Sequence, residues 1–274
     1  MNLKKCFLTA NRCYIQAVKM DGGKPTGIVV HSTGANNKTL KRYVQPLKTD
    51  ADYNEIIADI GKNAYGNHWN KDSKSACVHA FIGVNAKKEV ETYQTLPWDI
   101  CCWGVGKGKK GSYNYNPTAR IQFEICEDGL KDAAYFDQVF TEAAELCAYL
   151  CKEYGLGVEA ICSHAESYKA GFGSNHGDCD HWLKKFGKDM DWFRAEVKAL
   201  IEKPEKGSKG YKVKVTASAL NIRKGPGTNY KKAGCIKNKG VYTIVEEAEG
   251  KGASKWGKLK SGVGWISLDY VKKV

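Results

Sequence analysis

The stretch Gly27-Ile28-Val29-Val30-His31-Ser32-Thr33-Gly34-Ala35-Asn36-Asn37 decides the fold of this chain. It begins with a short run of β-branched apolar residues, which is typical of a buried strand. The run ends at a histidine, and polar residues and a glycine follow. We therefore expect a short buried strand over 27–31 with His31 at its end.

Apolar runs and helical periodicities alternate around this strand. One apolar stripe with spacings of three and four ends near Gly155, and Asp189 precedes another, as a helix cap would. Further strands are expected over 76–82, 119–126 and 158–163. This alternation predicts an α/β domain with a mixed central sheet flanked by helices.

The strand expected over 119–126 has a regular alternation of side chains. Successive residues of a strand point to opposite faces of its sheet. One face carries Ile121, Phe123 and Ile125, and the other carries Arg120, Gln122 and Glu124. The second face is therefore polar and holds a carboxylate.

A change of composition divides the chain into two parts. Residues 203–210 combine proline, glycine, serine and charge without an apolar anchor, which predicts a linker between domains at 1–202 and 211–274. Short β-rich runs separated by glycine-containing turns then predict a small all-β barrel. These runs are 212–215, 240–245, 256–259 and 264–267.

The formal net charge of +13 is concentrated in the second part. Residues 203–274 hold 17 lysines and arginines against 5 acidic residues, a net charge of +12, which leaves +1 for residues 1–202. Charge alone suggests a nucleic-acid-binding protein, and no recognised nucleic-acid motif accompanies it. We expect no nucleic-acid partner.

The eleven cysteines are odd in number, scattered and partly inside apolar runs. This usage is typical of reduced core residues rather than of a disulfide framework. No stretch approaches the roughly 18 consecutive apolar residues of a membrane helix. The N-terminus also lacks the apolar run and cleavage site of a secretory signal. We expect a protein made in the cytoplasm, with no signal peptide and no membrane partner.

Three histidines, His31, His164 and His176, follow strands directly or lie in a glycine-rich loop after one. Strand ends at one rim of a sheet can bring distant side chains together around a metal ion. A single histidine in such a place is more often a hydrogen-bonded structural residue. Three of them with acidic neighbours favour a metal site.

Several segments, taken in order, resemble the type 2 N-acetylmuramoyl-L-alanine amidases, which are related to the peptidoglycan recognition proteins. The resemblance covers nearly all of residues 1–202. It rests on 27–37, 78–83, 121–127, 163–166, 174–178 and 181–182. It implies hydrolysis of the amide bond between N-acetylmuramic acid and L-alanine of the peptidoglycan stem peptide.

The resemblance also implies one catalytic Zn²⁺ held by two histidines and a Cys or Asp. His31 and His164 match the histidine ligands, and Asp178 matches the third ligand. His176 and Cys179 compete with Asp178 for this role, because Cys179 stands where the family usually has proline and the loop after His164 is long. A zinc ion bound in this way would let water lose its proton near pH 7.

Two further residues match catalytic positions of the family. Glu124 would orient or deprotonate the water and return the proton to the leaving amine. His176, at the place of a family lysine, would stabilise the developing oxyanion. The alternative for Glu124 is a surface salt bridge.

Substrate contacts are expected from His79, Trp103 and Asn36, with a structural role as the alternative for His79. Trp103-Gly104-Val105-Gly106 lies where the family often has Trp-His-Ala-Gly, so a glycine replaces the histidine. His68 and His181 are interpreted as structural.

The C-terminal part resembles bacterial SH3-like domains over 219–230 and 264–271. This resemblance implies a wall-binding module that raises the local concentration of substrate. Its positive charge favours a polyanionic Gram-positive wall polymer as a partner.

Other interpretations stay open at this point. A cysteine amidase would use Cys162 or Cys77 with a nearby histidine, and a non-catalytic relative would bind peptidoglycan without cutting it. The order of domains resembles that of a phage or prophage endolysin, which stays in the cytoplasm until lysis. A bacterial autolysin is the alternative.

Overall fold

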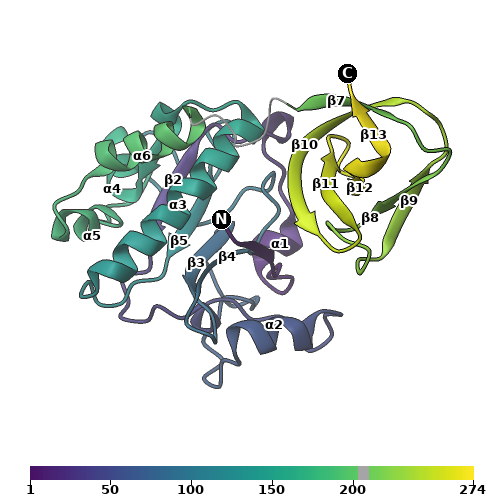
Figure 1. The fold of residues 1–274 in the computed structure, drawn as a ribbon. Helices are drawn as coiled ribbons and strands as arrows, with labels where there is room; N and C mark the ends of the chain where they lie inside the picture. The colour runs from purple at the N-terminus through teal and green to yellow at the C-terminus, as the bar shows by residue number, and fades with distance from the viewer. Residues whose placement is uncertain (203–209) are drawn as a thin grey trace. The chain divides into compact units, whose positions relative to one another are not determined.

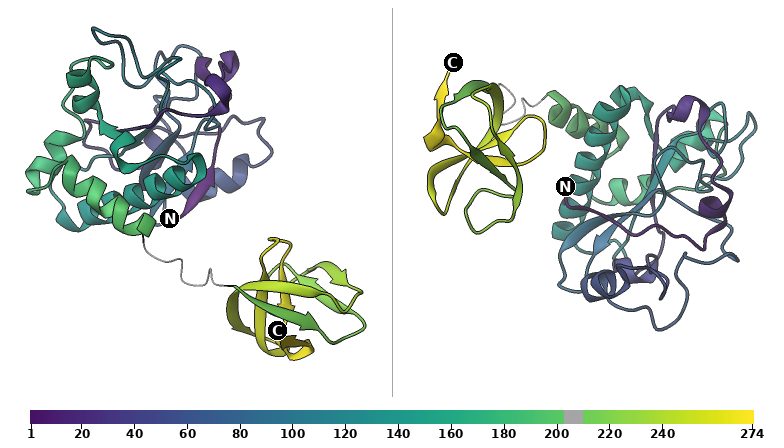
Figure 2. Two further views of the ribbon diagram at one scale, coloured as in Figure 1. Left: turned by 90° about the horizontal axis from the view of Figure 1, so that it is seen from above. Right: turned by 90° about the vertical axis from the view of Figure 1, so that its right-hand side faces the viewer.

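The structure is a computed structural model that describes residues 1–202 and 210–274. The chain divides into two compact units, Met1–Glu202 and Lys203–Val274, each described here by itself (Figure 2). Apart from Gly210, the linker expected over 203–210 lies outside the described residues.

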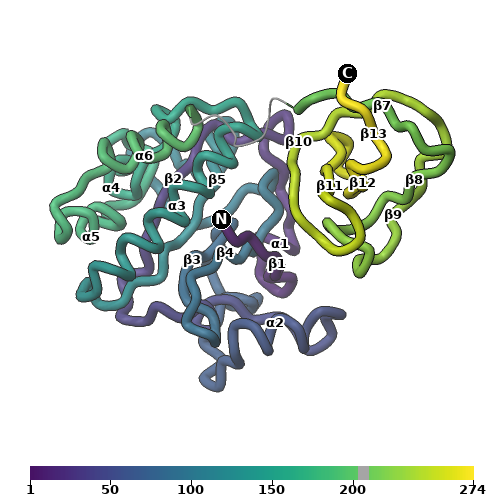
Figure 3. Tube along the Cα trace, in the orientation of Figure 1, coloured from purple at the N-terminus to yellow at the C-terminus, as the bar shows by residue number. Residues whose placement is uncertain are grey.

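The first unit is built on one mixed sheet with the strand order β1-β4-β3-β5-β2-β6. The β3–β4 pair is antiparallel and the other neighbouring strands are parallel. Figure 3 traces the path of the chain through this unit. The strands are β1 (Leu3–Lys5), β2 (Ile28–Ser32), β3 (Ala80–Val84), β4 (Val90–Gln94), β5 (Ile121–Ile125) and β6 (Ile161–Ser163). The predicted α/β class with a mixed sheet is confirmed.

Helices flank this sheet (Figure 1). They are α1 (Arg12–Gln16), α2 (Tyr53–Ile60), α3 (Ala133–Tyr154), α4 (His164–Ala170), α5 (Asp180–Lys185) and α6 (Met190–Glu202). The long helix α3 begins where Asp132 accepts hydrogen bonds from two backbone N–H groups, and it ends at Gly155, whose φ of 67° suits glycine.

The main core lies between the sheet and α3, which also packs against α6. Ile28 and Val30 of β2 and Phe123 of β5 are fully buried in it. In the parallel register His31 pairs with Glu124, so both side chains point to the face opposite this core. The alternation of side chains along β2 and β5 therefore places a histidine and a carboxylate side by side.

Two expected strands are shorter than predicted. Within 76–82, regular pairing begins only at Ala80, because Cys77 forms an isolated bridge with Trp103 instead. Within 158–163, the first half forms a 3₁₀ turn closed by a hydrogen bond from Ala160 N–H to the carbonyl of Gly157. An isolated bridge thus replaces the start of the first expected strand, and a turn replaces the start of the second.

The second unit is an all-β fold with the strand order β13-β7-β10-β11-β12-β8-β9, in which neighbouring strands are antiparallel. Its own apolar core includes Val213, Ile222, Ile244 and Ile266. The strands are β7 (Tyr211–Val215), β8 (Leu220–Arg223), β9 (Lys232–Ile236), β10 (Val241–Gly250), β11 (Ala253–Leu259), β12 (Trp265–Ser267) and β13 (Val271–Lys273). The expected small all-β domain is confirmed.

All eleven cysteines are free, and all but Cys162 and Cys235 are buried. This agrees with the expected use of cysteine as a reduced core residue. In the described ranges, no helix has both the length and the apolar character needed to cross a membrane.

Candidate metal centre

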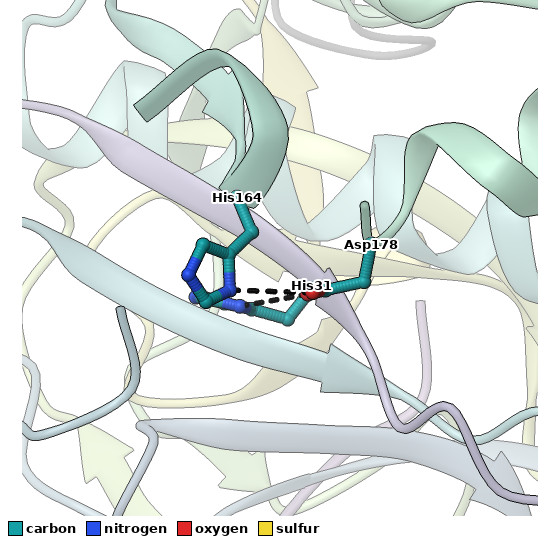
Figure 4. A group of neighbouring side chains, drawn as sticks. All are labelled: His31, His164 and Asp178. Carbon is teal, nitrogen blue, oxygen red and sulfur yellow. Dashed lines mark hydrogen bonds and ion pairs between the residues drawn. The ribbon is translucent and has the colours of Figure 1, made fainter. Parts of the chain in front are cut away.

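Three side chains from distant parts of the chain meet at the carboxyl end of the sheet (Figure 4). Nδ1 of His31 lies 3.0 Å from Oδ2 of Asp178, and Nδ1 of His164 lies 3.3 Å from Oδ1. The three potential ligand atoms lie within 4.8 Å of one another. The structure therefore brings together the three residues that the sequence singles out as metal ligands.

The local structure explains how each side chain reaches this point. His31 lies near the end of β2, and His164 is the first residue of α4, directly after β6. Ser163 caps α4 and forms a capping box with Glu166, which fixes the start of the helix. The backbone carbonyl of Asp178 accepts a hydrogen bond of 3.3 Å from Ala165 N–H, which ties the later loop to the same helix end.

This donor set fits a zinc ion. Both imidazoles are almost fully buried, and both direct a ring nitrogen at a carboxylate, which is the combination that binds catalytic zinc in proteins. Burial opposes the charge of Asp178, yet the hydrogen bonds with His164 and His31 outweigh burial and hold the pKa of Asp178 well below its usual value. The carboxylate is therefore ionised and available as a ligand.

Glu124 lies in the same pocket. Its Oε2 atom is buried and has no hydrogen-bond partner among the described residues. Burial, together with the carboxylates of Asp178 and Glu127, raises the pKa of Glu124 well above that of an ordinary glutamate. This environment suits a group that takes up and releases a proton, and no ion pair of Glu124 is seen within the described ranges.

These residues line one pocket of about 720 Å³. Its walls also include His176, which is exposed, and Trp103, which is partly exposed. Both therefore lie where the sequence analysis expects a group that contacts the substrate. The remaining lining residues are Ser32, Thr33, Gly34, Ser75, Gly104, Gly106, Asn114, Tyr115, Ser174, Gly177 and His181.

Two residues expected to contact the substrate, His79 and Asn36, lie outside the lining of this pocket. His79 is fully buried, its Nε2 donates to the carbonyl of Ile100 at 2.8 Å, and its Nδ1 accepts from Gln122 N–H at 3.0 Å. The structural alternative for His79 is therefore favoured. Asn36 is exposed but lies against Gly129, outside the pocket lining.

Cys179, one of the competing ligands, points away from the site. Its side chain is fully buried in the main core, and its sulfur lies 4.0 Å from the sulfur of Met190. A thiol in this position cannot reach the two histidines. His176, the other competitor, lies beside His164 with ring centroids 4.7 Å apart and ring planes tilted by 34°, but it does not belong to the ligand cluster.

The cysteine-nucleophile interpretation finds no support in the local environments. A hydrogen bond with Cys13 and burial raise the pKa of Cys77 well above its usual value. Burial raises the pKa of Cys162 to about 11. Reactive cysteines need a lowered pKa, so both thiols are in unsuitable surroundings.

The sequence analysis missed His181 as a pocket residue. Its Nε2 lies 3.0 Å from the buried carboxylate of Glu127, and this hydrogen bond raises the pKa of His181. Glu127 also accepts from the hydroxyl of Ser32 at 2.6 Å and from Gly34 N–H at 3.1 Å. The sequence signal for this role is that His181 lies only three positions after Asp178. It stands in the first turn of α5, which begins directly after the loop that carries Asp178.

Comparison with known proteins agrees with this architecture. A family model described as N-acetylmuramoyl-L-alanine amidase matches residues 21–180, and one described as bacterial SH3 domain matches residues 218–272. The chain belongs to the N-acetylmuramoyl-L-alanine amidase family. It is thus a peptidoglycan amidase with an SH3-like second domain.

Solved structures with a similar fold include the Staphylococcus aureus hydrolase AmiA in complex with its ligand. That chain is 20% identical, with a TM-score of 0.47, over 73% of this chain and 83% of AmiA. A mutant endolysin from Bacillus subtilis is 19% identical, with a TM-score of 0.45, over 72% of this chain and 99% of the endolysin. A comparison with curated protein sequences found no match.

Proposed function

We propose that this amidase cleaves the bond between N-acetylmuramic acid and L-alanine with the help of a zinc ion held by His31, His164 and Asp178. The observation that carries the proposal is the convergence of these three donors beside Glu124 in one open pocket. When bound, zinc supplies a Lewis acid that polarises a carbonyl oxygen and lowers the pKa of water to about 7.

The protein's own groups account for the remaining chemistry. Glu124 accepts the proton of the attacking water and later gives it to the leaving amine of L-alanine. The raised pKa of Glu124 favours this exchange near neutral pH.

His176 contributes from the exposed side of the pocket. Its Nδ1 lies 2.9 Å from the hydroxyl oxygen of Ser174, which leaves Nε2 free. We propose that Nε2, when it carries a proton, donates a hydrogen bond to the oxygen of the cleaved amide.

Digestion of purified Gram-positive cell walls tests the bond that is cut. New L-alanine amino termini and new reducing sugars are measured before and after removal of zinc, and again after zinc is restored. We expect zinc-dependent amino termini without reducing ends. Reducing ends would indicate cleavage of the glycan, and binding without either product would indicate a non-catalytic protein.

We also propose that the SH3-like domain holds the enzyme on a polyanionic wall polymer. The exposed lysines Lys231, Lys232, Lys237 and Lys239 and the net charge of +12 over 203–274 support this. Binding of the full chain to walls should weaken with salt and after removal of teichoic acid. Binding unaffected by both treatments would contradict it.

We propose, finally, that the protein acts as an endolysin that stays in the cytoplasm until the membrane opens. The pairing of a wall amidase with a wall-binding module supports this role. Fractionation of producing cells before and after lysis tests it. Secretion of the protein by intact cells would instead identify an autolysin.

A further inference from the structure

The loop between α2 and β3 carries a lysine, Lys74, at the rim of the pocket. Lys74 stands directly before Ser75, which belongs to the pocket lining. Its side chain is partly exposed, and its ammonium group lies over the ring of Trp69, 4.6 Å from the centroid. Within residues 1–202 and 210–274, Lys74 has no acidic side chain as an ion-pair partner. The ammonium group therefore keeps hydrogen-bond donors available for a ligand.

One buried amide holds this loop in place. Nδ2 of the fully buried Asn11 donates to the carbonyl of Trp69 at 3.0 Å and to that of Ala76 at 3.1 Å. The N–H of Trp69 in turn donates to the carbonyl of Tyr43 at 2.9 Å. Lys74 thus lies between two fixed points, which lowers the entropy lost when its ammonium group binds a partner.

Aromatic contacts place Lys74 on the Glu124 side of the pocket. The ring of Trp69 meets the ring of Phe81 edge to face, with centroids 5.0 Å apart. Phe81 pairs with Glu124 in the register of β3 and β5, so both side chains point to the same face of the sheet. Burial and the charge of Arg42 lower the pKa of Lys74, while the charge of Glu124 opposes this change.

Arg42 adds a second cation to this rim. Its guanidinium group lies over the ring of Tyr43, 5.3 Å from the centroid, and donates to the carbonyl of Asn67. Among the residues that the structure describes, Arg42 has no ion-pair partner either. Two neighbouring cations without a counter-charge make this rim attractive to an anionic group of the substrate.

The proposed reaction indicates which part of the substrate reaches Lys74. Glu124 gives a proton to the amine of L-alanine, so the stem peptide extends from the cleaved bond on the Glu124 side. One residue of extended chain spans roughly 3.3–3.6 Å. The residue that follows L-alanine therefore comes toward the rim at Ser75 and Lys74. A carboxylate there gains a charge-assisted hydrogen bond that an amide cannot match.

We propose that Lys74 binds a carboxylate on the second residue of the stem peptide, so that the enzyme prefers substrates in which this carboxyl is free to those in which it is amidated. The inference rests on the proposed function, because Glu124 marks the side on which the peptide extends. Asn11 and Trp69 are positioning residues, since they act through Lys74.

Two synthetic substrates that differ only in this carboxyl test the proposal. They are N-acetylmuramoyl-L-alanyl-D-isoglutamate and the corresponding D-isoglutamine compound. With the zinc-loaded full chain, we expect kcat/KM to be roughly tenfold higher for the carboxylate. The difference should appear in KM with kcat unchanged, because the carboxylate lies away from the reacting bond. Binding of both compounds to the metal-free chain, followed in ¹⁵N–¹H spectra, is the second readout.

Lys74→Met keeps an unbranched side chain over Trp69 without the charge, and it should make the two substrates equal. Lys74→Arg should retain the preference. The matched control is Lys71→Met in the same loop, where the ammonium group lies instead near Gly66. A change in the structure of the loop would slow cleavage of both substrates alike and leave their ratio unchanged.

The proposal is overturned if the unmodified enzyme treats both substrates equally. It is also overturned if the preference survives in Lys74→Met or is lost equally in Lys71→Met. Failure of the proposed function has a different signature. The metal-free chain would then bind the carboxylate compound more tightly through Lys74, but the zinc-loaded chain would cleave neither substrate.

Discussion

His31 and Asp178 are separated by 147 positions in the sequence, yet Nδ1 of the first lies 3.0 Å from Oδ2 of the second. The contact closes the loop after α4 onto the end of β2. It also brings together two groups that can bind the same cation.

Asp178→Asn should abolish high-affinity zinc binding, because a neutral amide oxygen is a poor replacement for a carboxylate ligand. We expect a loss larger than the roughly 10- to 100-fold effect of outer-shell changes. Metal content per chain and wall digestion measure it. The matched control is Asp180→Asn at the start of α5, and an equal loss in that variant would count against a specific role of Asp178.

Cys179→Ser should leave zinc binding unchanged. The substitution places a hydroxyl in the main core, so we expect a loss of about 1–3 kcal/mol in the free energy of unfolding. Denaturant unfolding and metal analysis of the same sample separate the two effects. Zinc-free Cys179→Ser protein with normal stability would identify Cys179 as a ligand after all.

Glu124→Gln should lower the rate of amide cleavage roughly 10²- to 10⁴-fold, because the amide cannot transfer a proton. Zinc content should stay at the level of the unmodified protein. Burial raises the pKa of Glu124 well above 4.5, so the acidic limb of kcat/KM in the unmodified enzyme should lie above pH 4.5. Activity within a few-fold of normal in the variant would remove Glu124 from the mechanism.

His79 should make the stability of the protein depend on pH. Burial disfavours the charged imidazolium and lowers the pKa of His79 from 6.5 to about 4. The unfolded chain therefore binds more protons between these two values, and stability falls as the pH falls from 6.5 toward 4. At 1.36 kcal/mol per pKa unit, the full effect is about 3 kcal/mol.

The variant His79→Asn isolates this effect, because its side-chain oxygen can still accept from Gln122 N–H while it does not titrate. Free energies of unfolding at pH 7.5 and pH 5 are compared in both proteins. The unmodified protein should lose about 2 kcal/mol more than the variant over this interval. Equal losses would show that His79 is protonated in the folded state.

The sequence predicts the strand that carries His31 and the helix that ends at Gly155, because β-branched runs and apolar stripes are local signals. It also indicates the polar face of β5, which holds Gln122 and Glu124. Alternation alone cannot distinguish a face toward solvent from a face toward a buried polar pocket. The full burial of Gln122 depends on the distant Asn114 and Tyr113.

The burial of His79 has the same origin. The carbonyl of Ile100 and the N–H of Gln122 contact His79 only in the folded chain, and the sequence around His79 does not predict these contacts. His181 shows the converse case. It joins the pocket because α5 begins at Asp180, two residues after Asp178, whereas the sequence alone leaves the direction of that turn open.

The most direct test of the account is a zinc titration of metal-free protein, with release of L-alanine amino termini from cell walls recorded at each addition. We expect no cleavage without metal, a linear rise in activity, and saturation at one zinc per chain. His164→Ala should show no such rise. Cleavage by the metal-free protein, or full activity of His164→Ala with zinc present, would contradict the claim that His31, His164 and Asp178 hold the catalytic metal.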